Sequence, residues 1–223
     1  MSKINRLSQL SHILKSYTDP KKRSLIAAQI NHSYFLLKYK FEKDFIFIHI
    51  NKTAGSSISA LLDMDRMHLT AFSIRNMITE ESWNAKFKFS FVRNPWDRVV
   101  SQYHHRYGVN QQNLQERLLD FKGWVKEVYL DRNKELINFH AMFMPQLYWI
   151  SDMNGSIIVD YIGRYENLQE DIAYIKDKLN ISKPLPHLRK SKREHYSTYY
   201  DNATKNIVGD FFKKDIEYFK YEF

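Results

Sequence analysis

A nearly unbroken apolar run covers Phe45 to Ile50 and stops abruptly at a turn of small and polar residues. Such a run predicts a strand buried on both faces of a parallel sheet. Apolar residues at helical spacing over 58–62 predict a helix after the turn, with Ser56 or Ser57 as its N-cap. A strand, a tight turn and a helix N-terminus direct backbone N–H groups and the helix dipole at one point, which favours an anion.

A second strand is predicted over 86–92, KFKFSFV, where phenylalanine alternates with polar residues. This pattern is typical of a strand with one deeply buried face. The strand ends at 93–98, RNPWDR. Asn94 can cap a helix there and Pro95 suits its first position, so we expect a helix to about Tyr107.

The remaining periodic segments predict a helix over about 70–78, a third strand over 157–162, an amphipathic helix over 168–179 and a closing helix over about 202–218. We assign to the core a helical face formed by Leu114, Leu118, Phe121, Val125 and Val128. The group 142–144 and the pair 148–149 are either core or the lining of an acceptor pocket, and core packing is the favoured interpretation.

Composition favours one folded domain with an anionic partner. The chain has 223 residues, of which 43% are hydrophobic and 15% aromatic, enough for a substantial core. We expect a domain over 41–223 and a helical N-terminal extension over 1–40. The 34 Lys and Arg outnumber the 25 Asp and Glu, giving a net charge of +9. This favours a nucleotide, nucleic acid, acidic glycan or membrane surface as partner, although the basic residues are spread along the chain.

The chain has no cysteine, which excludes disulfides and thiolate metal sites, and its histidines show no convincing metal-ligand spacing. No run of about 18 apolar residues occurs, so we expect a cytoplasmic protein. The basic amphipathic segment 1–40 packs against the domain or a partner subunit in the favoured interpretation. The alternative is peripheral contact with the inner face of the membrane. The oligomeric state stays open.

Three groups of residues carry candidate chemistry. Lys52 adds a cation to the first turn. Arg93 lies at the end of the second strand, and Ser101 lies roughly 9 Å along the following helix from Pro95. Arg93 and Ser101 can grip one phosphate from two sides, whereas in the simpler alternative Arg93 only pairs with Asp97.

The late segment 182–196, SKPLPHLRKSKREHY, contains two prolines and five Lys or Arg. Prolines at these positions forbid regular structure, and the charges favour an ordered loop or lid over an anion. An ordinary solvated basic loop is the equally good alternative on charge alone.

These features together resemble the sulfotransferases that use 3′-phosphoadenosine 5′-phosphosulfate (PAPS), specifically the carbohydrate sulfotransferase type (sulfotransferase family 2-like). The family's first loop reads approximately PKTAGSS, and 51–57 reads NKTAGSS, with Asn51 in place of proline. The second family signature, RNPxDRxxSxY, matches fully from Arg93 through Ser101 to Tyr103. Further matches are HLTA at 68–71, IGRYENL at 162–168, LPHLRKS at 185–191 and DIEYFKYEF at 215–223. The resemblance covers about 44–223.

The resemblance implies a three-layer α/β sandwich with a central parallel sheet, like that of P-loop nucleotide kinases. It also implies in-line transfer of a sulfuryl group from PAPS, without a metal, to a hydroxyl of a carbohydrate, glycolipid or other glycoconjugate, and no nucleic-acid partner. The 5′-phosphosulfate would be held by Lys52, Thr53, Ala54, Gly55, Ser56 and Ser57, with Gly55 allowing close backbone approach. The 3′-phosphate would be held by Arg93 and Ser101, while Lys190 and Ser191 close the late loop. Asn51 is expected to loosen the loop and to place an extra amide near the donor.

Two catalytic residues follow from the same resemblance. Lys52 would neutralise charge on the leaving phosphate oxygen as the S–O bond breaks. His68 matches the HLTA position, and imidazole has the chemistry of a general base for the acceptor hydroxyl. His49 and His104 are the next candidates for this base.

Two other classes of protein stay open on the sequence. A P-loop-like kinase or NTPase has a similar topology, but G-x-x-x-x-G-K-[ST] is absent. A non-catalytic basic module that binds nucleic acid would show affinity that falls steeply with salt.

Overall fold

The computed structural model describes residues 43–137, 140–186 and 193–223, and the predicted helical extension over 1–40 lies outside them. Its sheet has three parallel strands in the order β1-β2-β3, which are β1 (Phe45–Ile48), β2 (Phe87–Val92) and β3 (Tyr161–Arg164). Phe45 pairs with Phe87, and Phe89 pairs with Tyr161. The predicted α/β class and parallel pairing are therefore confirmed.

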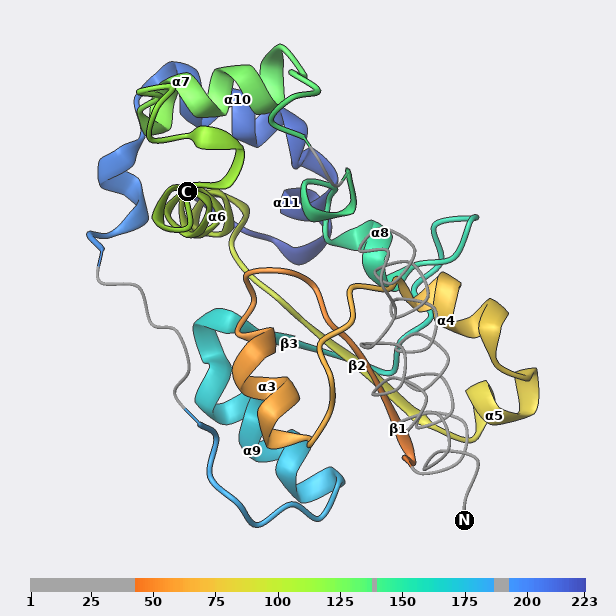
Figure 1. Cartoon of the computed structure of the whole chain (residues 1–223). Coiled ribbons are helices and arrows are strands. Elements are labelled where there is room, and N and C mark those ends of the chain that lie inside the picture. The colour runs from red at the N-terminus through yellow and green to blue at the C-terminus, as the bar shows by residue number, and fades with distance from the viewer. Residues whose placement is uncertain (1–42, 138–139, 187–192) are drawn as a thin grey trace, which may run out of the picture.

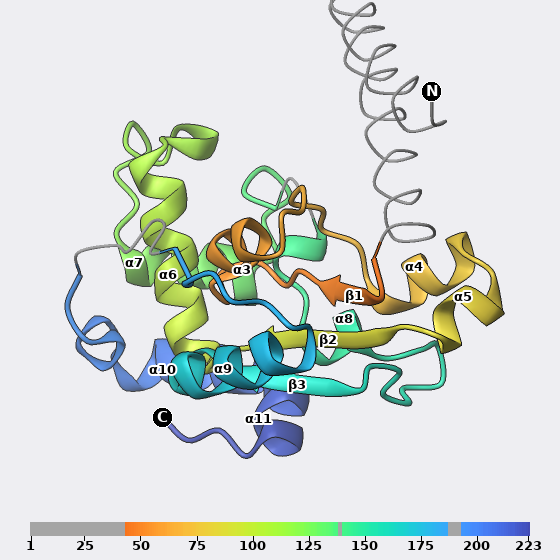
Figure 2. The same ribbon diagram turned by 90° about the horizontal axis from the view of Figure 1, so that it is seen from below.

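Helices lie on both sides of this sheet. In Figure 1, α3 and α9 lie on one side of the strands, and α4, α5 and α8 lie on the other. The view in Figure 2 shows α6, α7 and α10 gathered at one end of the sheet. The helices are α3 (Gly55–Leu61), α4 (Ala71–Met77), α5 (Glu80–Asn84), α6 (Pro95–Gly108), α7 (Phe121–Val125), α8 (Leu147–Ile150), α9 (Leu168–Lys178), α10 (Asn202–Phe211) and α11 (Lys213–Phe219). A π-helical turn, Lys126–Leu130, continues α7.

Two apolar clusters form the core. The first packs α3, α4, α8 and α9 on the sheet around residues such as Ile46, Phe89 and Phe91, each 0% exposed. The second joins α6, α7 and α10 around Val99, Trp124 and Val208. The sheet and the helical part thus each have a buried core, and α6 follows directly from β2 to connect them. None of the helices described here is long and apolar enough to cross a membrane.

The predicted strands are partly wrong in extent and burial. The first strand ends at Ile48, and β2 is buried on both faces. Ser90 is buried because its hydroxyl donates to the Ile48 carbonyl oxygen at 2.8 Å. The third strand begins later than predicted, at Tyr161, since the Asp160 carboxylate pairs with Lys88 Nζ at 3.0 Å and accepts from the Lys88 backbone N–H.

Asn94 caps α6 with Pro95 at its first turn, as predicted. The helix predicted over about 70–78 is α4, and Thr70 is its N-cap. The prediction that Ser56 or Ser57 caps α3 is wrong. This helix begins at Gly55, and its N-cap is Ala54, at a φ of 64°, whose methyl side chain cannot accept a hydrogen bond.

Two predictions for the helical part are also wrong. Leu118 is 87% exposed, because 114–118 forms turns with Leu118 at a φ of 51° instead of continuing a helix. The closing helix divides at Phe212 into α10 and α11. This division accompanies the burial of Asp215, whose carboxylate accepts from the backbone N–H groups of Gln146 and Leu147 at 2.7 and 2.9 Å.

Candidate active site

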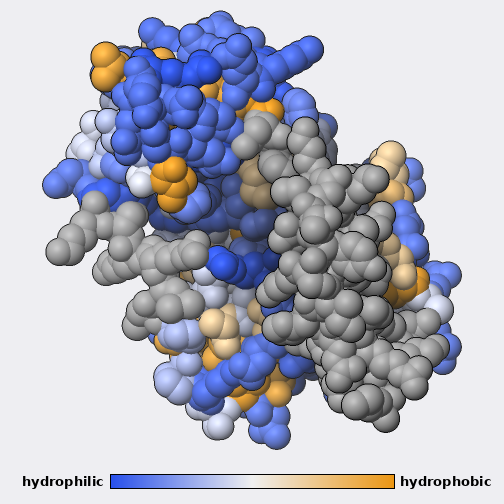
Figure 3. All heavy atoms as spheres, in the orientation of Figure 1, coloured by the Kyte–Doolittle hydropathy of each residue, from blue (hydrophilic) through white to orange (hydrophobic). Residues whose placement is uncertain are grey.

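A cavity of about 1330 Å³ lies beyond the carboxyl ends of all three strands. Its walls include residues of 49–57 after β1, 93–106 after β2, 165–170 after β3 and 193–196 from the later chain. Figure 3 shows hydrophilic residues gathered in the hollow between the sheet part and the helical part. The carboxyl ends of parallel strands are where open α/β sheets place their ligands. The volume exceeds the 300–1,000 Å³ or so typical of a pocket for one small ligand, so it has room for two.

The first turn follows the predicted course but does not use every residue as predicted. Lys52, Ala54, Gly55, Ser56 and Ser57 line the cavity. Thr53 does not, because its side chain is fully buried and its hydroxyl donates to the Ile50 carbonyl oxygen at 2.9 Å.

Two residues of this turn have a strained backbone. Lys52 has a φ of 68° and Ala54 a φ of 64°, in the left-handed region that non-glycine residues rarely adopt. Each such residue costs on the order of 1–3 kcal/mol, and strain of this kind clusters at ligand sites. A strained turn that the surrounding fold maintains is preorganised for the ligand it faces.

The surroundings of Gly55 require a glycine for a reason that the sequence did not indicate. A Cβ at this position would lie 1.9 Å from His49 Nε2, so the imidazole of His49 occupies the space that a side chain would need. His49 is itself 5% exposed. The glycine therefore makes room for the His49 ring. Because His49 directly follows β1, this packing holds the start of α3 against the end of that strand.

Replacing Gly55 with alanine is expected to push the His49 ring aside and to lower both the free energy of unfolding and donor affinity. Overpacking of this kind costs about 1–3 kcal/mol. The measurement is chemical denaturation of Gly55→Ala alone and combined with His49→Ala, which removes the clashing ring. The alanine at 55 is expected to cost less in the His49→Ala background.

Gly108→Ala is the matched control, since a Cβ there meets nothing within 4 Å. Equal costs of Gly55→Ala in both backgrounds would contradict the ring contact.

Asn51 lines the cavity and its side chain is firmly held, so the predicted loosening of the loop is wrong. That its amide lies near the donor stays a prediction. Its side-chain Nδ2 donates to the Met142 carbonyl oxygen at 2.9 Å. Arg98, which is 1% exposed, donates to Asn51 Oδ1 at 2.6 Å and to the Asn51 carbonyl oxygen at 3.2 Å. The same guanidinium reaches the carbonyl oxygens of Met142 and Met144. One buried cation on α6 thus ties the turn after β1 to the 142–144 segment.

Asn51→Ala is expected to lower the free energy of unfolding by about 1–3 kcal/mol, because Arg98 stays buried after losing its Oδ1 partner. Urea denaturation measures the change. Asn84→Ala, at an exposed position in α5, is the matched control and is expected to stay within about 0.5 kcal/mol of the parent protein. A loss at Asn51 no larger than this control value would show that the amide contributes nothing to holding the loop.

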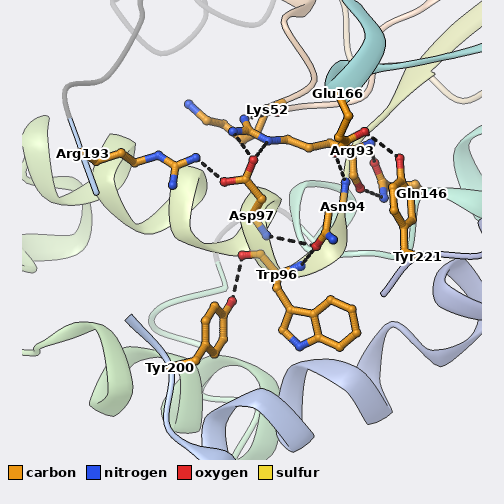
Figure 4. Close-up of polar contacts among 10 residues, drawn as sticks. All are labelled: Lys52, Arg93, Asn94, Trp96, Asp97, Gln146, Glu166, Arg193, Tyr200 and Tyr221. Carbon is orange, nitrogen blue, oxygen red and sulfur yellow. Dashed lines mark hydrogen bonds and ion pairs between the residues drawn. The ribbon is translucent and has the colours of Figure 1, made fainter. Parts of the chain in front are cut away.

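Side chains from distant parts of the chain form hydrogen bonds with the backbone of the Arg93–Asn94 turn after β2 (Figure 4). Gln146, which is 0% exposed, accepts from the Arg93 backbone N–H at 2.9 Å and donates to the Arg93 carbonyl oxygen at 2.8 Å. Glu166 accepts from the Asn94 backbone N–H at 2.6 Å and from the Tyr221 hydroxyl at 3.2 Å. No local pattern singles out Gln146, whose partner is 53 positions away.

The Arg93 side chain both lines the cavity and pairs with Asp97. Its Nε donates to Asp97 Oδ2 at 2.8 Å, and its Nη1 donates to the Lys52 carbonyl oxygen at 3.0 Å. The guanidinium also lies over the Tyr165 ring, 3.8 Å from its centroid. The pairing with Asp97 is therefore present, and Ser101 lines the same cavity as Arg93. The grip of Arg93 and Ser101 on one phosphate stays a prediction.

His68 lines the cavity beside His49, with ring centroids 4.4 Å apart. Its Nδ1 lies 3.1 Å from the His49 carbonyl oxygen. Because a carbonyl can only accept, Nδ1 carries the proton and Nε2 of the neutral ring keeps its lone pair. Partial burial lowers the pKa of His68 from its usual value, and the nearby cations Arg66 and Arg98 add to this, against the hydrogen bond to His49, which raises it.

The other two candidate bases are less suitable. Burial lowers the pKa of His49 to about 3, so this ring is a very weak base. His104 does not line the cavity. Of the predicted donor residues, Lys190 and Ser191 lie outside the described residues. Over 43–137, 140–186 and 193–223, no group of three or more His, Asp or Glu is arranged to hold a metal ion.

The fold is α/β, and one cavity brings together the strained turn after the first strand, an Arg and a Ser after the second strand, and His68. Such an arrangement is typical of a site for an anionic ligand. A family model described as the sulfotransferase family matches residues 37–222. The chain therefore belongs to the sulfotransferase family.

Two relatives are similar to this chain. An uncharacterized protein of Archaeoglobus fulgidus is 34% identical over 117 residues, which cover 52% of this chain and 87% of that protein. Carbohydrate sulfotransferase 14 of Danio rerio is 25% identical over 138 residues, which cover 55% of this chain and 36% of that protein. The chain thus matches only about a third of the length of the second relative. No solved structure gives a significant match.

Proposed function

We propose that this sulfotransferase moves a sulfuryl group from PAPS to a hydroxyl of a carbohydrate or glycoconjugate by in-line displacement. The observation that carries the proposal is that Lys52, the Arg93–Ser101 pair and His68 line one cavity. A donor with phosphate groups at both ends matches two separate anion-binding turns, one after β1 and one after β2. We also propose that the sheet and its helices form a three-layer sandwich like that of P-loop nucleotide kinases.

In this proposal the turn after β1 binds the 5′-phosphosulfate. Charge builds up on the leaving phosphate oxygen as the S–O bond breaks, much as in phosphoryl transfer. Lys52 and the backbone N–H groups at the start of α3 neutralise that charge. Arg93 and Ser101 bind the 3′-phosphate, and Lys190 with Ser191 complete the donor site from the late segment.

The acceptor is placed on the His68 side of the cavity. His68 Nε2 takes the proton of the acceptor hydroxyl as the oxygen attacks sulfur, and the Nδ1–H bond to the His49 carbonyl keeps the ring in the required tautomer. The wall around the acceptor is drawn from cavity residues outside the donor assignment, which include Arg66, Gln102, His105, Arg106 and Met142. Their hydrogen-bonding groups suit a hydroxyl-rich ligand, and the name of the Danio rerio relative favours a carbohydrate.

Thermal unfolding with product nucleotide tests the donor assignment without knowledge of the acceptor. Adenosine 3′,5′-bisphosphate is expected to raise the melting temperature more than an equal concentration of ATP when no metal is added. A larger shift with ATP that depends on Mg²⁺ would favour a nucleotide kinase and contradict the proposal.

A further inference from the structure

The connection between α3 and α4 contributes two polar residues to the cavity wall. In Figure 1 this connection returns from the far end of α3 toward the turn after β1 before it enters α4. Arg66 and His68 line the cavity, whereas Met67 and Leu69 pack against the core of the sheet. Alternation of this kind is typical of an extended chain, in which residues two positions apart lie on one side. Arg66 therefore shares the cavity side of the connection with the proposed base.

Arg66 also reaches the turn after β1. Its Nη1 donates to Ser56 Oγ at 3.4 Å, at the start of α3. Burial is the largest cause of the lowered pKa of His68 and of His49, and the charge of the Arg66 guanidinium lowers both further. None of the ion pairs among the described residues involves Arg66. One exposed cation is thus close both to the turn after β1 and to His68.

The group that is transferred in the proposed reaction passes between these two places. The acceptor oxygen forms a bond with sulfur as the bond between sulfur and the phosphate oxygen breaks, and the hydroxyl proton goes to His68 Nε2. The turn after β1 binds the leaving side and His68 binds the entering side. The three outer oxygens of the sulfuryl group accept hydrogen bonds, and the planar fork of a guanidinium matches two of them at once.

We propose that Arg66 is a further catalytic residue, which donates hydrogen bonds to the outer oxygens of the sulfuryl group and holds its sulfur in line between the leaving oxygen and the acceptor hydroxyl. This inference rests on the proposed function. Arg66 lies outside the sequence motifs that match the family, which resume at His68. Its charge has a second effect, since a cation beside an imidazole disfavours the protonated ring and so helps to keep the base neutral.

The first measurement compares Arg66→Gln with the unmodified protein in the transfer of ³⁵S-labelled sulfuryl from PAPS to a panel of oligosaccharides. The kcat is expected to fall by about tenfold or more, because the reacting atoms are less well aligned. Affinity for adenosine 3′,5′-bisphosphate is expected to stay unchanged, because this nucleotide carries no sulfuryl group. Arg66→Lys keeps the charge without the fork and is expected to retain an intermediate kcat.

The pH profile of kcat separates this role from a structural one. Burial and the charges of Arg66 and Arg98 lower the pKa of His68, and the hydrogen bond to the His49 carbonyl oxygen raises it. The His49 ring itself is neutral at these pH values, since its pKa is about 3. Removing the Arg66 charge raises the pKa of His68, so the acid limb is expected to move to higher pH in Arg66→Gln and not in Arg66→Lys. An equal loss of kcat in both variants at every pH would indicate structural damage and overturn the inference.

Arg117→Gln is the matched control, because Arg117 pairs with Glu135 at an exposed position and does not line the cavity. Its kcat and pH profile are expected to match those of the unmodified protein.

The remaining outcomes distinguish this inference from the proposed function. If the unmodified protein transfers label to no hydroxyl, the proposed function fails and the role of Arg66 fails with it. If the unmodified protein transfers label and Arg66→Gln keeps its kcat, the proposed function stands and the role of Arg66 is wrong. A higher KM for the oligosaccharide at unchanged kcat would assign Arg66 to acceptor binding alone and would likewise overturn the inference.

Discussion

Replacing His68 with alanine is expected to lower turnover by at least about 10²-fold, the lower end of what general-base catalysis contributes. Affinity for adenosine 3′,5′-bisphosphate is expected to stay close to that of the unmodified protein. The reason is that the residues proposed to bind the donor lie in the turns after β1 and β2, whereas the His68 ring is held by the His49 carbonyl oxygen. Single-turnover transfer and nucleotide titration measure the two quantities separately.

The pH dependence provides an independent check on His68. Its pKa in the folded protein lies below the usual 6.5, so the neutral ring predominates at neutral pH. Turnover should therefore be level around pH 7 and fall only at a pH below 6.5, as the ring gains a proton and Nε2 loses its lone pair. His140→Ala, at an exposed position outside the cavity, is the matched control. Near-normal turnover in His68→Ala would assign the base to another residue.

Replacing Lys52 with alanine is expected to lower turnover by roughly 10²–10³-fold, the cost of removing one group aimed at developing charge. Alanine adopts the φ of 68° no less readily than lysine, so the change removes the cation without adding backbone strain. Affinity for adenosine 3′,5′-bisphosphate is expected to fall as well, since the 5′-phosphate stays next to the missing cation.

Lys213→Ala on the exposed surface of α11 controls for the loss of one positive charge, because its side chain is 72% exposed. Turnover and nucleotide affinity both unchanged in Lys52→Ala would remove this residue from the donor site.

The parts of this site that follow a local rule were predictable from the sequence. The apolar run before Ile50, the cap at Asn94 and the proline at 95 are local signals, and the structure places the corresponding turns next to each other. The pairing of β1 with β2 brings those turns to one edge of the sheet because parallel strands end on the same side.

The contacts that hold the turns in place were not predictable, because each joins residues that are far apart in the chain. Gln146 clamps Arg93, and Arg98 holds Asn51 from 47 positions away. A glutamine or an arginine in a sequence carries no sign of being fully buried, since both are usually exposed. Gly55 was predicted to allow close approach to its backbone, but the close packing of the His49 ring against it had no sign in the sequence.

Asn51 illustrates why a departure from a family pattern needs the structure to interpret it. An asparagine in place of a proline suggested a looser loop. The amide instead completes the hydrogen bonding of a buried guanidinium that also holds the carbonyl oxygens of Met142 and Met144. The turn after β1 is therefore coupled to the 142–144 segment, and Met142 lines the cavity.

Sulfuryl transfer from PAPS carrying ³⁵S, offered with a panel of oligosaccharides and without added metal, tests the central claim most directly. The account predicts that label appears on an oligosaccharide hydroxyl together with an equal amount of adenosine 3′,5′-bisphosphate, and that Lys52→Ala and His68→Ala abolish most of it. Label that stays in the donor or appears only in small phenols or peptides, while the protein binds the bisphosphate normally, would contradict a carbohydrate acceptor. Failure of the unmodified protein both to bind the bisphosphate and to transfer label to any hydroxyl would contradict the claim as a whole.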